Sequence, residues 1–120
     1  MKHGWNALIR EILAFRDQRD WKQFHTPKNL AAAIAIEAAE LQEHFLWKTD
    51  REVRTALRNP RKRGQVLEEL ADVIIFALLL AERLEVDIDA TVRRKLRDNA
   101  KKYPVEKARG NHKKYTELDP

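Results

Sequence analysis

Two pairs of carboxylates inside apolar sequence constrain the fold of this chain more than any other feature. Glu37 and Glu40 lie within AAAIAIEAAEL, and Glu69 and Asp72 lie within EELADVIIFALLL. Residues three apart on a helix differ by about 60° in direction and about 4.5 Å in rise, so each pair shares one face. Ionised carboxylates among apolar neighbours are costly to bury unless they are paired or bind metal. We therefore expect two neighbouring helices whose four acidic side chains converge on a site for a hard cation.

The composition favours a small all-α protein. The chain has 120 residues with only 3 Gly and 4 Pro, and it is rich in Ala, Leu, Glu, Lys and Arg, which indicates mostly helix. No stretch alternates with a period of two for long enough to propose a sheet. The length predicts one domain over residues 1–120. The absence of cysteine excludes a disulfide framework, a thiolate metal site and a thiol nucleophile.

Hydrophobic periodicity and capping signals predict the helices. Thr26-Pro27 and Asn59-Pro60 each read as an N-cap followed by proline at the first helical position, and Thr49 to Glu52 resembles a capping box. We expect a four-helix, bundle-like domain with one additional short helix, followed by a polar tail over 105–120. The predicted helices span residues 5–19, 27–48, 50–57, 60–84 and from 87 or 89 to 103.

The most apolar segment is residues 73–81, which is hydrophobic all round. Such a helix is central to its fold or buried against another subunit. Its nine residues are too few to cross a bilayer, and the N-terminal sequence has no signal-peptide hydrophobic region. These features predict a cytoplasmic protein with no membrane partner.

The carboxylate pairs fit a metal site better than ordinary salt bridges. No Lys or Arg lies within four residues of any of the four acids, so local ion pairs cannot explain them. Oxygen-only ligands suit Mg²⁺, with Mn²⁺ as a substitute. Di-iron bundles need Glu-x-x-His, which this chain lacks, so iron is disfavoured.

Positive charge gathers near the C-terminus. The net charge is +5, and residues 93–114 hold ten Lys or Arg against two acids, Asp98 and Glu106. This distribution is compatible with a solvated basic face, a polyphosphate ligand or nucleic acid. A Mg²⁺ site together with basic side chains indicates phosphate chemistry, in which ions bridge phosphoryl oxygens and activate water.

The motifs resemble those of a known family. The E-x-x-E, spacer, E-x-x-D pattern is similar to that of the all-α nucleoside triphosphate pyrophosphohydrolases, the MazG-like superfamily, and within it to the dCTP pyrophosphatase branch. The resemblance extends over residues 5–118, and the segments that carry it are Arg19-Asp20-Trp21, Gln23-Phe24-His25, Pro27, Asn29-Leu30, Trp47-Lys48-Thr49-Asp50, Glu68-Glu69, Asp72-Val73, Tyr103-Pro104 and Lys114 to Leu118.

The resemblance implies hydrolysis of a nucleoside triphosphate between the α and β phosphates, giving a monophosphate and pyrophosphate. It assigns metal binding and catalysis to Glu37, Glu40, Glu69 and Asp72. It also implies that the protein assembles into dimers or tetramers. For the base and sugar it points to Trp21, His25, Trp47, Asn99 and Tyr103. We add Phe76 as a ring that can stack on the substrate, and Lys102 of the basic C-terminal helix as a group that can neutralise the leaving pyrophosphate. Indoles stack on bases, and an amide offers both a donor and an acceptor to a base edge or sugar.

Two departures from the dCTP branch leave the base preference open. Phe76 stands where the branch has tyrosine, and Ile12 stands where it tends to have histidine, so two polar contacts are missing. The leading hypothesis is a housecleaning enzyme for dCTP-like or modified nucleotides. The alternatives are another base preference, such as dUTP or damaged nucleotides, a bundle that binds a nucleotide without turnover, and a basic nucleic-acid-binding module over residues 93–114.

Overall fold

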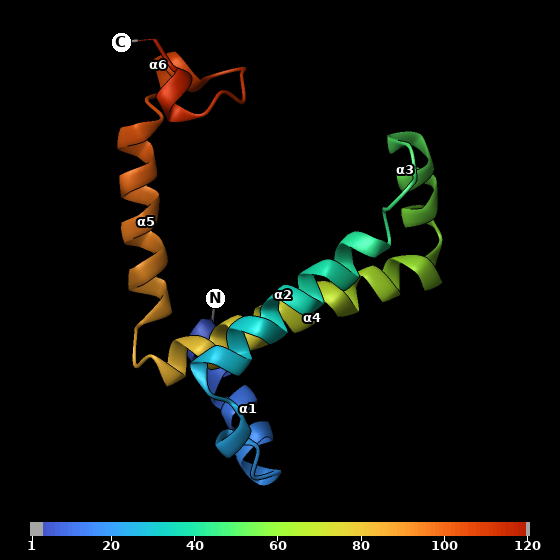
Figure 1. Ribbon diagram of the computed structural model, residues 1–120, viewed down its shortest axis with the longest axis vertical. Coiled ribbons are helices and arrows are strands. Elements are labelled where there is room, and N and C mark those ends of the chain that lie inside the picture. The colour runs from blue at the N-terminus through green and yellow to red at the C-terminus, as the bar shows by residue number, and fades with distance from the viewer. Residues whose placement is uncertain (1–3, 120) are drawn as a thin grey trace. The chain divides into compact units, whose positions relative to one another are not determined.

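The computed structural model describes residues 4–119, and within that range it contains only helices, turns and loops (Figure 1). The predicted all-α class is confirmed. Residues 1–3 and 120 of the predicted domain lie outside the described residues. None of the described helices is both long and apolar enough to cross a membrane. The helices are α1 (Trp5–Gln18), α2 (Pro27–Glu43), α3 (Asp50–Arg58), α4 (Pro60–Arg83), α5 (Ile88–Lys102) and α6 (Val105–Ala108), with 3₁₀ turns η1 (Lys22–Phe24) and η2 (Tyr115–Glu117).

The chain divides into two compact units, one ending at Val86 and the other beginning at Asp87. In the first unit, α4 contacts α1, α2 and α3. Figure 1 shows α2 and α4 side by side and running in opposite directions, so the two acidic stretches lie on neighbouring helices. The second unit holds α5, α6 and η2, so the predicted polar tail is not wholly irregular. The single domain over residues 1–120 stays a prediction.

The predicted caps form at four helix starts. The side chain of Thr26 accepts a backbone N–H at the start of α2, and that of Asn59 accepts two at the start of α4. Thr49 and Glu52 form a reciprocal capping box at α3. Asp87, rather than Asp89, caps α5. These side chains satisfy backbone donors that have no partner inside the helix, and they fix where each helix begins.

The end of α2 differs from the prediction. The helix ends at Glu43, five residues before the predicted end, and turns occupy residues 44–47. Trp47 adopts a left-handed backbone with φ of 64°. That conformation costs an L-residue about 1–2 kcal/mol, and an α-helix cannot continue through it. Its side chain is 92% exposed, so no packing inside this chain compensates for the strain.

The core of the first unit lies around the C-terminal half of α4. Leu78, Leu79 and Ala81 are buried there, and Leu30 of α2 is 1% exposed. Residues 73–81 were predicted to be central to the fold, and the second half of this segment is buried as expected. The first half of the segment is less buried: Ile74 and Ile75 each keep 36% of their surface exposed.

A buried ion pair joins α1 to α4. Arg16 is 3% exposed, and it donates to Glu82 at 2.6 Å and to Asp17 at 2.8 Å. A buried guanidinium requires such acceptors, because its charge is otherwise costly to remove from water. Periodicity alone did not single out this pair.

Replacing Arg16 with methionine is expected to lower the free energy of unfolding by about 1–2 kcal/mol. The side-chain volume is largely kept, but the Glu82 carboxylate loses its partner, and its 29% exposed side chain can hydrate only in part. Urea denaturation followed by circular dichroism measures the change. Arg10→Met is the matched control, because Arg10 is an exposed residue of the same helix; equal losses in both variants would contradict a role for the pair.

Candidate functional site

Three of the four predicted carboxylates meet between α2 and α4. Glu37, Glu40 and Glu69 each offer an oxygen, and these atoms lie within 4.8 Å of one another. The three side chains are partly buried. Glu37 and Glu40 are one helical turn apart on α2, and the antiparallel contact of α2 with α4 brings Glu69 to them.

Asp72 is close to this group but is not one of the three. Burial is the main cause that raises the pKa of Glu37, and the charge of Asp72 adds to that shift after the contributions of Glu40 and Glu69. Asp72 lies one helical turn after Glu69, so the two share a face of α4. Its predicted role as a fourth ligand stays a prediction.

Glu37 has the most unusual environment in the cluster. Burial raises its pKa from 4.5 to about 7, helped by hydrogen bonds with Glu40 and Glu69 and by the charges of Glu40 and Asp72. Its Oε2 is buried without a hydrogen-bond partner among the described residues. Crowded carboxylates with an unpaired buried oxygen fit a hard divalent cation, which supplies the missing positive charge.

No lysine or arginine among the described residues neutralises the carboxylate cluster through an ion pair. Within residues 4–119 no Lys or Arg forms an ion pair with Glu37, Glu40 or Glu69. Only His44 approaches, with its Nε2 3.7 Å from Glu69 Oε1. Sequence reasoning did not assign a role to His44, although it lies two turns after Glu37 on the same face. That spacing was the available signal.

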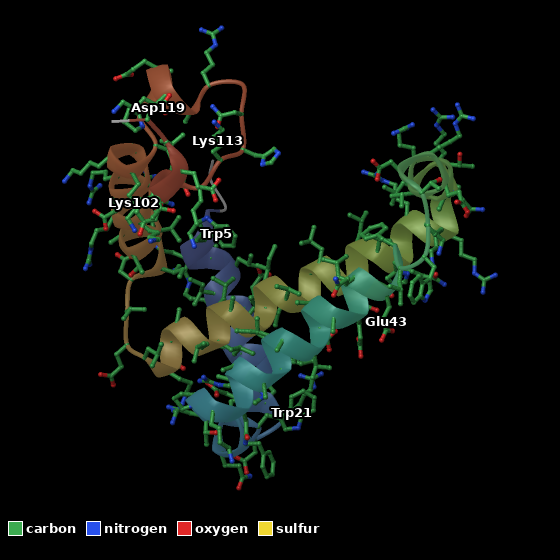
Figure 2. The ribbon with its side chains drawn as sticks, turned by 45° about the horizontal axis from the view of Figure 1, so that its top comes forward. Trp5, Trp21, Glu43, Lys102, Lys113 and Asp119 are labelled. Atoms are coloured by element: carbon green, nitrogen blue, oxygen red, sulfur yellow. The ribbon has the colours of Figure 1, made fainter. Side chains whose placement is uncertain are left out.

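Trp21 and His25 lie away from the carboxylates in this chain. They precede α2, and the helical rise places Glu37 about 15 Å along the axis from the start of that helix. Figure 2 shows Trp21 near one end of α2 and Glu43 at the other. Trp21 packs edge-on against Phe15 with ring centroids 5.7 Å apart, and it lies 6.3 Å from the ring of His25. A single chain therefore does not bring these rings to the acidic cluster.

His25 is a half-buried imidazole with one ring nitrogen that lacks a hydrogen-bond partner among the described residues. Burial, and then the charges of Arg16 and Arg83, lower its pKa. Its Nδ1 is buried and has no hydrogen-bond partner among the described residues. The Nδ1 of such an imidazole can form one hydrogen bond with a ligand, which is compatible with the substrate role that was predicted for His25.

The other predicted substrate residues divide between the two units. Phe76 is half-buried one turn after Asp72 on α4, and Trp47 is exposed after α2. Asn99, Lys102 and Tyr103 belong to the second unit, where Tyr103 packs edge-on against Tyr115 at 6.1 Å. Lys102 Nζ lies 4.8 Å from the centre of the same Tyr115 ring. Their substrate roles stay predictions.

Comparison with known proteins identifies the family. The profile of the MazG-like family matches residues 32–118, which include all four predicted acids. The chain belongs to the MazG-like family. The resemblance inferred from the sequence motifs is therefore confirmed.

Named relatives refine the comparison. This MazG-like chain is 45% identical over 111 residues to human dCTP pyrophosphatase 1, covering 92% of this chain and 65% of the relative. The bovine protein of the same name is 43% identical over 111 residues. The chain thus spans about two-thirds of the length of these relatives. A pyrophosphatase from Archaeoglobus fulgidus shares the fold with a TM-score of 0.78 and 43% identity, over 85% of this chain and 94% of that one.

Proposed function

We propose that this protein is a Mg²⁺-dependent nucleoside triphosphate pyrophosphohydrolase that acts in nucleotide-pool housecleaning. It cleaves dCTP-like or modified nucleotides between the α and β phosphates, giving a monophosphate and pyrophosphate. The observation that carries this proposal is the group formed by Glu37, Glu40 and Glu69, whose oxygens lie within 4.8 Å of one another. The names of the mammalian relatives and of the archaeal pyrophosphatase support the reaction class.

The carboxylates of α2 and α4 account for the metal requirement. Glu37, Glu40 and Glu69 would hold the ion, and Asp72 adds negative charge on the same face. When bound, a divalent ion neutralises charge on phosphoryl oxygens and lowers the pKa of an attacking water. Without metal, burial and then the acidic neighbours raise the pKa of Glu37 to about 7, so a proton competes for this carboxylate near neutral pH. Mg²⁺ is favoured over softer metals by the all-oxygen donor set, and Mn²⁺ is its natural substitute.

The base preference follows from residues that can stack rather than from directed polar contacts. Phe76 and the exposed ring of Trp47 offer stacking surfaces in the first unit. A site with few directed hydrogen bonds discriminates weakly among bases. Modified cytosine nucleotides, dUTP and damaged nucleotides are therefore the substrates to compare with dCTP.

Pyrophosphate release from a panel of nucleoside triphosphates, with Mg²⁺ and with EDTA, tests the proposed function. We expect metal-dependent release that is strongest for dCTP or a modified cytosine nucleotide. Release spread over many bases would keep the reaction and change the substrate. No release from any nucleotide, combined with salt-dependent DNA binding, would favour the basic nucleic-acid-binding module instead.

We also propose that the protein is a homo-oligomer. Leu67, Leu70 and Ile74 follow the i, i+3, i+7 spacing of one face of α4, and all are exposed in the single chain. On α1, Leu8 and Phe15 are exposed on one face as well. Apolar stripes of this kind mark surfaces that another chain covers, and a second copy is the partner common to both stripes.

Substituting Leu70 with aspartate is expected to convert the oligomer into monomers, because a charge on this stripe cannot be buried without a partner. Light scattering coupled to size-exclusion chromatography measures the mass. Gln65→Asp places the same charge at an exposed polar position of α4 and is expected to keep the oligomer. A wild-type protein that is monomeric at high concentration would contradict the assembly.

A further inference from the structure

A lysine and a histidine lie behind one of the metal-binding carboxylates. Lys62 Nζ is 2.9 Å from His44 Nδ1, and His44 Nε2 is 3.7 Å from Glu69 Oε1. The three residues come from the end of α2 and from the first half of α4. The side chains of His44 and Glu69 are 16% and 22% exposed, so water reaches this contact only in part.

The lysine determines which nitrogen of the ring carries the proton. A lysine ammonium has three donors and no acceptor, so His44 Nδ1 must accept its hydrogen bond. The neutral ring then carries its proton on Nε2, the nitrogen that faces Glu69. At 3.7 Å the contact is an electrostatic one between an N–H dipole and a carboxylate rather than a full hydrogen bond.

A protonated Nε2 cannot bind a metal ion, because its lone pair is taken. His44 is thus excluded as a further ligand in this arrangement, although it lies beside the cluster. What it can do is restrain Oε1 of Glu69 through this contact, and the carboxylate keeps its second oxygen for a metal ion. Supporting residues of this type orient metal ligands and typically change metal affinity by about 10- to 100-fold.

We propose that Lys62 and His44 form a positioning relay that fixes the Glu69 carboxylate for metal binding. This inference rests on the proposed function, since it concerns the same metal site. Lys62 acts through His44, and His44 acts through Glu69; neither touches the nucleotide or the ion. Helical spacing puts His44 two turns after Glu37 and Lys62 two turns before Glu69, but only the contact of α2 with α4 brings the lysine to the histidine.

The test measures Mn²⁺ affinity by electron paramagnetic resonance, which requires no substrate and no turnover. We expect His44→Leu to weaken Mn²⁺ binding about tenfold. In His44→Gln the amide nitrogen replaces the Nε2–H donor, so we expect binding within about twofold of the wild type. Circular dichroism establishes that each variant is folded. Equal weakening in the leucine and glutamine variants, or none in either, would overturn the relay.

Removing Lys62 also removes a positive charge near a cation site, which by itself strengthens Mn²⁺ binding. Arg63→Met is the matched control, because it removes the same charge from an exposed neighbouring position. We expect Lys62→Met to bind Mn²⁺ about threefold more weakly than Arg63→Met when His44 is present, and equally when His44 is leucine. If Lys62→Met still binds Mn²⁺ more weakly than Arg63→Met when His44 is leucine, Lys62 does not act through His44 and the relay is overturned.

These measurements separate the relay from the enzymatic proposal. Wild-type protein that binds Mn²⁺ and shows the expected variant pattern, yet hydrolyses no nucleotide, would support the relay and reject the proposed function. Wild-type protein that hydrolyses nucleotides, with Mn²⁺ affinity unchanged in His44→Leu, would retain the function and reject the relay.

Discussion

Replacing Glu69 with alanine is expected to lower kcat/KM for the best nucleotide by more than about a hundredfold, beyond the loss typical of residues that only support a metal ligand. Glu69 is the group from α4 that completes the three-carboxylate cluster with Glu37 and Glu40. Its loss leaves two ligands from a single helix, which cannot surround an ion. Pyrophosphate release under saturating Mg²⁺ measures the change.

The matched control is Glu68→Ala, which removes the same group from the adjacent, exposed position of the same helix. Residue 68 points about 100° away from residue 69, so it is not part of the cluster. We expect near-wild-type turnover in this variant and a native circular dichroism spectrum in both. Equal activity of the two variants would remove the metal role from Glu69 and return the carboxylates to a structural role.

Mn²⁺ binding is expected to strengthen about tenfold between pH 6 and pH 8, because the proton on Glu37 must leave before the carboxylate binds metal. The pKa of this carboxyl is raised to about 7, mainly by burial and then by its acidic neighbours. Below that pH the proton competes with the ion, and above it the carboxylate is free. Titrations of Mn²⁺ at several pH values measure the slope.

Glu37→Gln provides the control, since the amide keeps the shape and has no proton to lose in this range. We expect weak Mn²⁺ binding that does not vary between pH 6 and pH 8. The same group affects metal-free stability: its raised pKa stabilises the fold below pH 4.5, and this contribution is lost as the pH rises through about 7. Wild-type unfolding free energy that shows no greater decline over this range than Glu37→Gln would contradict the raised pKa.

The helices were predictable because their signals are local. Proline after a capping residue at Thr26 and Asn59 determines where α2 and α4 begin, and the structure retains both starts. The end of α2 was predicted five residues late, because nothing in the local pattern announces the left-handed backbone of Trp47. Many helices end at a glycine in the left-handed conformation, and α2 has no glycine at its end to signal the boundary.

The sequence by itself determined that the fold is all-α and that two helices carry acidic pairs on apolar faces. Spacing along a helix is fixed by its 3.6-residue period, so Glu37 and Glu40 had to share a face. Only the tertiary structure decided how the helices meet. It brought Glu69 into the cluster, kept Asp72 slightly outside, and placed His44 and Lys62 behind Glu69. These outcomes depend on the register between α2 and α4, which is set by packing of side chains from both helices rather than by any local pattern.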